Sequence, residues 1–439
     1  MVSLFFGPPD PALFLNARKT AMSPLSQLAE TLTGSEIVRL GNEISARIRK
    51  GEQIYNYTIG DFDPALFPIP PELEQNIIAA YRDHQTNYPP AGGIAELRAA
   101  VAAYTKELEG IDYDPEEIQI AAGGRPLIYS LFRTLVDPGD KVIYAVPSWN
   151  NNHYVHMNGG EHCMIQTLPE NNFMPTAADI APHIPGTALL CLCTPQNPTG
   201  TTLSRGELER ICDLVLEENR RRGAGEKKLY LMFDQMYFTL TYGETVHYNP
   251  VSLRPAMKEY TIFIDGISKA FAATGVRVGW AMGPAGVIGR MKALLSHIGA
   301  WSPMAEQKAT AAFLQDKEAV NGYLEQFRKS LEERLWRIYR GILDMKAQGL
   351  PIDAIEPQAA IYMTLRLDLR GMRDGERLLA GQGDVTGYLL DKARLAIVPF
   401  SSFGADKDSP WYRLSVGTCR IEDIGDMLAQ LKSALEALS

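Results

Sequence analysis

The chain has 439 residues, of which 46% are hydrophobic, and a formal net charge of −9 at pH 7. This length suffices for a large core and about two to three domains. The net charge is negative and the sequence contains no block of basic residues, which argues against nucleic acid or an anionic membrane as a partner.

The N-terminal region divides into an extension of uncertain status and a predicted helix. Residues 1–21 lack the charged start, long apolar centre and cleavage site of a signal peptide. Residues 34–48 carry apolar side chains at helical spacing, which predicts an amphipathic helix. No apolar stretch of the sequence reaches the roughly 18 residues of a membrane span.

From residue 64 to residue 301, strand-like and helix-like segments alternate, which favours a mostly parallel sheet covered by helices. Residues 121–126 form a glycine-rich loop that opens a helix over 127–132. Backbone N–H groups at such a helix start make an anion site. Farther along, the predicted strand 141–145 is followed by Trp149.

Three later strands in this region each deliver polar residues to their C-terminal ends. The strand 188–192 leads into a turn that contains two prolines and Asn197. The strand 229–233 ends at Asp234, with Tyr237 three residues beyond. The third strand, 261–264, ends at an acid and a glycine, Asp265 and Gly266.

Lys269 follows the apolar strand 261–264 within a run of small residues. A partly desolvated lysine at such an edge has a lowered pKa, and its free amine can form a Schiff base. Taken alone, a solvated surface lysine is the commoner explanation of a Ser-Lys pair. The order of Asn197, Asp234, Tyr237 and Lys269 along the chain favours the functional interpretation.

The C-terminal part predicts a smaller α/β unit. A long helical pattern over 305–347 precedes a strand at 359–365 and a helix at 384–391. Arg413 lies within the apolar strand 412–416, where an unpaired guanidinium is costly unless it meets an anion. The alternative for Arg413 is a structural ion pair.

In this combination and order, these motifs resemble the class I/II aminotransferases, which are fold-type I pyridoxal phosphate enzymes, from about Leu28 to the C-terminus. The resemblance implies an α/β fold with a large domain, whose mostly parallel sheet is covered by helices, and a smaller α/β domain. It implies a division into an extension at 1–21, an N-terminal segment at 22–60 that joins the small domain, a large cofactor domain at 61–330 and a C-terminal small domain at 331–439.

The resemblance also implies the catalytic roles. Lys269 would form the Schiff base with pyridoxal 5′-phosphate and then move the proton at the substrate Cα. Asp234 would pair with the pyridinium nitrogen, which lets the ring accept electrons. Asn197 and Tyr237 would hydrogen-bond the phenolic oxygen of the ring; an Asx-type turn residue and a core tyrosine are their structural alternatives.

The phosphate site implied by the resemblance uses Gly124 and Arg125 at the helix start, with Ser268 and Arg277 completing it. Related proteins generally carry hydroxyl residues at the positions of Gly124 and Gly266, so this chain departs from the pattern at two phosphate ligands. Arg125 and Ser268 are the candidates to compensate.

The remaining implied contacts concern the cofactor ring, the substrate and a second subunit. Trp149 would stack on the pyridine ring, whereas Gly60 and Arg413 would line the pocket for the substrate α-carboxylate. Tyr88 matches the tyrosine that reaches the phosphate of the neighbouring subunit, which implies a homodimer with shared active sites.

The predicted activity is transfer of an α-amino group from an amino acid to a 2-oxo acid through a pyridoxamine form, with no metal. A β-lyase or a decarboxylase with the same cofactor is the alternative, because these motifs do not set which bond breaks. A non-catalytic ligand sensor fused to a DNA reader is the remote alternative, since the residues before Asp61 are too few and not basic enough for such a reader.

Substrate choice stays open at the level of sequence. The aromatic residues of the loops, including Phe400, favour an apolar or aromatic amino acid, whereas His153 and Arg366 favour a dicarboxylate. The five cysteines are odd in number, mostly lie in apolar runs and lack metal-ligand spacing, which predicts reduced thiols in a cytoplasmic protein.

Overall fold

The computed structural model describes residues 25–34 and 36–439, and it consists of two units. The first unit contains the short helix α1 (Gln27–Thr31), which begins at Ser26 because the Ser26 hydroxyl accepts a hydrogen bond from the Ala29 amide at 3.2 Å. The extension expected at 1–21 lies outside the described residues. All other elements belong to the second unit.

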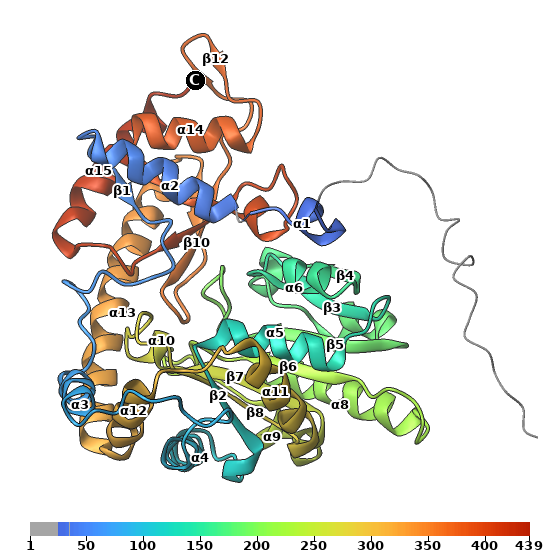
Figure 1. Cartoon of the computed structure of the whole chain (residues 1–439). Coiled ribbons are helices and arrows are strands. Elements are labelled where there is room, and N and C mark those ends of the chain that lie inside the picture. Colours follow the sequence, from blue (N-terminus) through green and yellow to red (C-terminus); the bar gives the residue numbers. More distant parts are fainter. Residues whose placement is uncertain (1–24, 35) are drawn as a thin grey trace, which may run out of the picture. The chain divides into compact units, whose positions relative to one another are not determined.

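A seven-stranded sheet is the centre of the second unit in residues 36–439 (Figure 1). Its neighbouring strands are parallel except for β8, which runs antiparallel to both β2 and β7. In spatial order the strands are β2 (Ile118–Ala121), β8 (Gly279–Met282), β7 (Thr261–Gly266), β6 (Tyr230–Asp234), β5 (Thr187–Cys193), β3 (Lys141–Val146) and β4 (Glu161–Gln166).

Helices cover both faces of this sheet, and the strands alternate their apolar side chains between two cores. Phe263 of β7 belongs to one core cluster, whereas its neighbours Ile262 and Ile264 belong to the other. The connecting helices are α3 (Pro71–Arg82), α4 (Ala95–Glu109), α5 (Gly124–Leu135), α6 (Asn151–Met157), α7 (Ala177–Ile180), α8 (Arg205–Arg221), α9 (Pro250–Leu253), α10 (Ile267–Ala270), α11 (Ala285–Ile298) and α12 (Met304–Gln315).

The helical pattern predicted over 305–347 is two helices, α12 and α13 (Lys317–Ala347). The break is at Asp316, whose carboxylate accepts a hydrogen bond from the Ala319 amide at 3.0 Å and so caps the start of α13. The prediction of one continuous helix was therefore wrong at this residue.

A second, four-stranded antiparallel sheet lies beyond α13, and with its helices it forms a separate core cluster. Its strands, in spatial order, are β14 (Val398–Pro399), β15 (Trp411–Ser415), β10 (Tyr362–Leu367) and β9 (Ile352–Ala354). The other elements of this region are α14 (Gln382–Lys392), the short 3-10 helix η6 (Phe400–Phe403), α15 (Ile424–Glu436) and the hairpin of β11 (Arg373–Asp374) and β12 (Arg377–Leu378).

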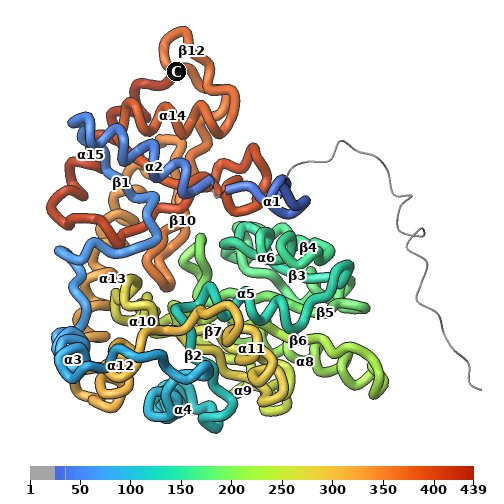
Figure 2. Tube along the Cα trace, in the orientation of Figure 1, coloured from blue at the N-terminus to red at the C-terminus, as the bar shows by residue number. Residues whose placement is uncertain are grey.

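The segment that follows the first unit packs with this C-terminal region, as the Cα trace shows (Figure 2). Helix α2 (Glu36–Arg49) places Arg47 in an ion pair with Asp391 of α14 at 2.9 Å. Strand β1 (Tyr55–Asn56) then pairs in parallel with β13 (Leu395–Ala396).

Candidate active site

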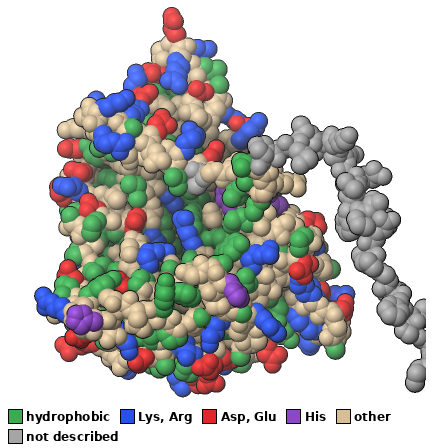
Figure 3. All heavy atoms as spheres, in the orientation of Figure 1, with side chains coloured by type: hydrophobic (Ala, Val, Ile, Leu, Met, Phe, Trp, Pro, Cys, Tyr) green, Lys and Arg blue, Asp and Glu red, His purple; other side chains and the backbone are tan. Residues whose placement is uncertain are grey.

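The predicted site residues follow the C-terminal ends of neighbouring parallel strands. The last residue of β5, Cys193, is in register with Asp234 at the end of β6, and Asp234 is in register with Ile264 of β7. Because parallel strands deliver their C-terminal ends to one edge, the segments that carry Asn197 and Lys269 meet Asp234 there. Lys and Arg side chains are visible in a hollow between the large sheet and the C-terminal region (Figure 3).

Lys269 lies on α10, directly after β7, and its Nζ donates to the carbonyl oxygen of Gly60 at 2.5 Å. Burial lowers the pKa of Lys269 to about 8, and Asp61 opposes that shift. The positive charges of Arg413, Arg125 and Arg277 contribute to the same lowering, so all three guanidinium groups act on the lysine. A lysine with this pKa supplies much more free amine at neutral pH than a solvated one.

Asp234 is a buried carboxylate, and burial raises its pKa to about 6. Its Oδ1 accepts a hydrogen bond from the Met236 amide at 3.2 Å, which leaves acceptor capacity on the carboxylate. A protonated pyridine nitrogen is a suitable donor for that capacity. The Asp234 carboxylate therefore fits pyridoxal phosphate, the cofactor that the sequence predicted.

Tyr237 is also buried, and its hydroxyl lies 2.6 Å from the hydroxyl of Tyr362. Burial raises the pKa of Tyr237 well above its usual value, so the phenol stays protonated. Its ring lies 6.0 Å from the Lys269 ammonium. Tyr237 thus keeps an O–H group beside the lysine.

Arg413 is 2% exposed and has no acidic partner within residues 25–34 and 36–439. Its Nη2 donates to the Thr58 carbonyl oxygen at 2.6 Å and its Nη1 to Oδ1 of Asn197 at 2.9 Å, while Nε has no hydrogen-bond partner in the described chain. Its guanidinium lies 4.7 Å from the ring centre of Tyr362 and 4.9 Å from that of Phe403. A buried cation with spare donors and no counter-ion is suited to an anionic ligand.

Gly60 lies against the same two side chains. A Cβ atom at Gly60 would be 2.8 Å from the Tyr362 hydroxyl and 3.6 Å from Nη1 of Arg413. Any larger residue would therefore displace Tyr362, which explains the glycine at this wall of the pocket.

The start of α5 forms the predicted anion loop. Gly123 precedes the helix with φ at 84°, a conformation that favours glycine. Arg277 fixes this loop because its Nη2 donates to the Ala122 carbonyl oxygen and its Nη1 to that of Thr274, each at 2.7 Å. Arg125 is exposed, and its guanidinium lies 4.6 Å from the ring centre of Trp149, while Ser268 is buried.

The two glycines that replace the usual hydroxyl residues have different surroundings. A Cβ at Gly266 would lie 2.7 Å from the Val278 carbonyl oxygen and 2.8 Å from Cα of Gly279, both backbone atoms of the adjoining segment. At Gly124 the nearest atom, at 2.8 Å, is the terminal methyl of Met236, a flexible side chain. The backbone thus requires glycine at 266 but not at 124.

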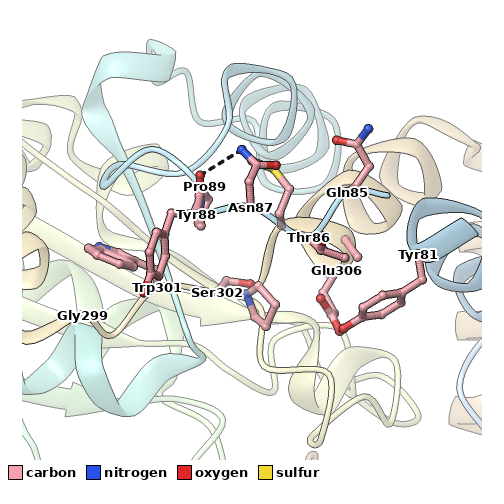
Figure 4. A pocket seen from close by; sticks show the side chains of 13 residues that line it. Tyr81, Gln85, Thr86, Asn87, Tyr88, Pro89, Gly299, Trp301, Ser302 and Glu306 are labelled. Atoms are coloured by element: carbon pink, nitrogen blue, oxygen red, sulfur yellow. Dashed lines mark hydrogen bonds between the residues drawn. The ribbon is translucent and has the colours of Figure 1, made fainter. Parts of the chain in front are cut away.

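Tyr88 is the one predicted site residue that stands apart from this cluster in the described chain. It is 83% exposed, and its ring lies 5.3 Å from that of Trp301 in an edge-to-face contact. Both line a pocket of about 510 Å³, in which Glu306 also accepts a hydrogen bond from Tyr81 at 2.8 Å (Figure 4).

The substrate-side residues considered from sequence also lie in different places. Arg366 is exposed on β10 and pairs with Asp368 at 2.8 Å, and Phe400 is fully buried against Phe173, so neither supports the role considered for it. Burial lowers the pKa of His153, which favours its neutral form.

Sequence reasoning placed Tyr362 only among the loops expected at the side-chain pocket and gave Asp61 no role, although both belong to this site. Tyr362 touches Tyr237, Arg413 and the space beside Gly60. Asp61 accepts a hydrogen bond from the Thr274 hydroxyl at 2.7 Å and acts on the pKa of Lys269. Their one signal was adjacency to the motifs, since Asp61 follows Gly60.

Comparisons with known proteins agree on one family. Residues 56–431 match the model of the aminotransferase class I and II family. The aspartate/prephenate aminotransferase of Thermus thermophilus is 30% identical over 389 residues, which are 88% of this chain and 92% of that protein. The aspartate aminotransferase of Geobacillus stearothermophilus is 29% identical over 407 residues, 92% of this chain and 94% of that protein.

Comparisons with solved structures indicate the same family. The aspartate aminotransferase of Rhizobium meliloti superposes with a TM-score of 0.86 at 25% identity, covering 95% of this chain and all of that one. The aspartate aminotransferase of Thermus thermophilus with maleate gives 0.84 at 28% identity, covering 94% and 100%. This chain therefore belongs to the class I and II aminotransferases and is a pyridoxal phosphate-dependent enzyme of fold type I.

Proposed function

We propose that this aminotransferase acts on aspartate or another dicarboxylic amino acid and a 2-oxo acid, with Lys269 as its catalytic residue. The observation that carries the proposal is the buried guanidinium of Arg413, which has no acidic partner among the described residues. It lies near Lys269, whose pKa is lowered to about 8. The two relatives named above, an aspartate and an aspartate/prephenate aminotransferase, support the substrate class.

The proposed chemistry divides between the cofactor and the chain. Bound pyridoxal phosphate supplies a ring that withdraws electrons from the amino-acid Cα. Lys269 provides the amine that holds the cofactor and moves the proton at Cα, and Asp234 holds the proton on the ring nitrogen. Each of these roles needs a buried group with a shifted pKa, as both residues have.

Asn197 and Tyr237 are proposed to donate hydrogen bonds to the phenolic oxygen of the cofactor. Oδ1 of Asn197 already accepts from Arg413, which leaves its amide N–H groups to donate. The Tyr362 hydroxyl can donate to that of Tyr237, which frees the Tyr237 proton for the cofactor.

The phosphate is proposed to bind to the amides at the start of α5, at Gly124 and Arg125, and to the side chains of Ser268 and Arg277. The helix start favours an anion, and Arg277 is already held against the loop. Trp149 is proposed to stack on the ring. The α-carboxylate of the substrate is proposed to bind Arg413 beside Gly60, where the guanidinium has a free Nε–H.

A dicarboxylate is favoured over an aromatic substrate because the cleft carries a surplus of positive charge. Arg277 and Arg413 are assigned to the phosphate and the α-carboxylate, whereas the guanidinium of Arg125, which also lowers the pKa of Lys269, has no assigned anion. The aromatic side chain of Phe400, which favoured an apolar substrate at the level of sequence, is buried in a core cluster.

The direct test is the absorption spectrum of the holoenzyme during titration with single amino acids and no oxo acid. Aspartate should convert the bound cofactor to its amino form and release one equivalent of oxaloacetate, whereas phenylalanine should convert it at much higher concentration. Release of ammonia or carbon dioxide in place of the oxo acid would replace the proposal with a lyase or a decarboxylase.

A homodimer with shared active sites is part of the proposal, supported by the exposed Tyr88 ring, which contacts the half-buried Trp301 (Figure 4). An exposed aromatic side chain beside a pocket is the kind of surface that a second copy covers. Light scattering should give about twice 48.6 kDa. Tyr88→Phe should weaken cofactor retention without changing this mass, and a monomeric active enzyme would contradict the proposal.

We further propose the division into a segment at 22–60, a large domain at 61–330 and a small domain at 331–439. Separate core clusters under the two sheets and the pairing of β1 with β13 support it. No helix of the described residues is long and apolar enough to cross a membrane. All five cysteines lie in the described chain as free thiols, which supports a cytoplasmic location.

A further inference from the structure

A second cavity, of about 580 Å³, opens between the end of α4, the loop that follows β6, the start of α9 and α13. None of the residues proposed for the active site lines it. Glu109, His247 and Thr239 are among the polar residues that line it, and Phe238 and Leu324 contribute apolar surface.

Several buried polar atoms of this cavity have no partner. The side chain of Glu109 is 3% exposed and that of His247 is 7% exposed. Within the described chain, no hydrogen bond reaches Oε1 of Glu109, either ring nitrogen of His247 or the hydroxyl of Thr239. Oε1 of Glu109 lies 3.8 Å from Nε2 of His247, which is too long for a hydrogen bond between them.

Two hydrogen bonds to other atoms of Glu109 fix the position of its unpartnered oxygen, Oε1. Oε2 of Glu109 accepts from Nε2 of Gln235 at 2.6 Å. The backbone carbonyl of Glu109 accepts from Nδ2 of Asn249 at 3.2 Å. Glu109 is therefore a preorganised acceptor on the wall of the cavity, and Gln235 is the residue next to Asp234.

The ionisable groups around Glu109 include carboxyl groups that a cationic ligand can ionise. Burial raises the pKa of Glu109 to about 8 and lowers that of His247 to about 3, so the imidazole is neutral and offers one acceptor nitrogen. Asp265 of β7 is a second buried acid that interacts with Glu109, and burial raises its pKa well above the usual value. Glu325 and Arg328 of α13 line the cavity and have opposite charges.

The remaining titratable neighbours do not supply a cation. Tyr104 of α4 and Tyr113, which follows α4, interact with Glu109 as buried phenols. No group of three or more His, Cys, Asp or Glu in residues 25–34 and 36–439 is arranged to hold a metal ion, which argues against a metal as the ligand.

We propose that this cavity is a binding site for a small organic cation with several N–H donors, a guanidinium or a primary ammonium on a short aliphatic body. Its N–H groups donate to Oε1 of Glu109 and to the acceptor nitrogen of His247, and its aliphatic part packs on Phe238 and Leu324. Ion pairing and hydrogen bonding together keep the bound carboxylate ionised. The inference is independent of the substrate proposed above.

Calorimetric titration of the holoenzyme with N-methylguanidinium chloride tests this site, because that cation does not condense with the cofactor aldehyde as an amine does. N-methylurea is the neutral isostere. The cation should bind with release of close to one proton at pH 7, since Glu109 must ionise, as measured in buffers of different ionisation enthalpy. Methylurea should bind at least about tenfold more weakly.

Three variants separate this site from the rest of the molecule. Glu109→Gln keeps an acceptor for Gln235 and should weaken binding of the cation at least about tenfold, with no proton release. Glu325→Gln, on the same cavity, should change affinity less than about threefold. Arg413→Ala, in the active site, should leave the affinity unchanged.

Equal binding of the cation and the urea, no binding of either, or full affinity in Glu109→Gln would each overturn the proposal. If Glu109→Gln fails to fold, Thr239→Val and the proton release of the wild type decide the matter. Thr239→Val should weaken binding by a smaller factor, and the absence of proton release by the wild type would count against the site.

Discussion

The active-site cleft and the Glu109 cavity both contain buried ionisable groups without counter-ions, basic groups in the cleft and acidic groups in the cavity. In the cleft, Arg413 has a spare donor, and burial lowers the pKa of Lys269. In the cavity, Glu109 has a spare acceptor, and burial raises its pKa. A buried group is costly to ionise without a counter-ion, so each region favours a ligand whose charge is opposite to that of its own ionised group.

The largest effect expected in this comparison follows the loss of the lysine. Lys269→Ala should abolish covalent attachment of the cofactor and lower turnover by more than about a thousandfold, because the lysine supplies both the amine and the proton transfer. Borohydride reduction followed by peptide mass spectrometry measures the attachment. Lys308→Ala, at an exposed ion pair with Glu96, is the control and should retain both; an adduct on another lysine would refute the assignment.

The next effect distinguishes two buried arginines. Arg413→Ala should weaken amino-acid binding by about ten- to a hundredfold while the cofactor stays attached, because it removes a charged pair of donors. Arg334→Ala should instead destabilise the fold, since its Nε and Nη1 already donate to Cys419 and Ser330 at 2.8 Å. Spectral titration gives the affinity, and equal affinities of the two variants would contradict an anion-binding role for Arg413.

A smaller effect concerns the two glycines of the phosphate region. Gly266→Ser should lower the free energy of unfolding by about 1–3 kcal/mol, because its Cβ would meet backbone atoms of Val278 and Gly279. Gly124→Ser should cost less than about 1 kcal/mol, since the methyl of Met236 can move. Urea unfolding of the apoenzyme compares them, and equal losses would mean that the backbone at 266 adapts.

The smallest effect is a pair of opposite pH dependences in the apoenzyme. The pKa of Glu109 rises from 4.5 to about 8 on folding, so the native state binds more protons and stability falls as pH rises between these values. The pKa of Lys269 falls from 10.5 to about 8, so the unfolded state binds more protons and stability rises with pH between about 8 and 10.5.

Glu109→Gln and Lys269→Met should each remove one of these slopes, with changes on the order of 1 kcal/mol in the unfolding free energy across its window. Urea unfolding at pH 5.5, 8 and 10 measures both. A slope of the same sign for the two sites would show that burial does not control them.

Local patterns in the sequence were enough to locate the strand ends that carry Asp234 and Lys269. An apolar run that stops at an acid or at small residues has the same appearance in any context, and the structure places Asp234 at the end of β6 and Lys269 shortly after β7. The break at Asp316 was missed because the apolar spacing continues through it, whereas the cap depends on the local backbone.

The sequence by itself thus determined the family, the cofactor, the parallel sheet and the order of the residues at its edge, because these depend on short-range patterns and on motif order. The tertiary structure alone decided that Tyr362 and Phe403 enclose Arg413, that Arg366 faces away and that Glu109 meets His247 in a second cavity. Those contacts join segments far apart in the chain, and burial, which sets each pKa and each unpaired donor, exists only after they pack.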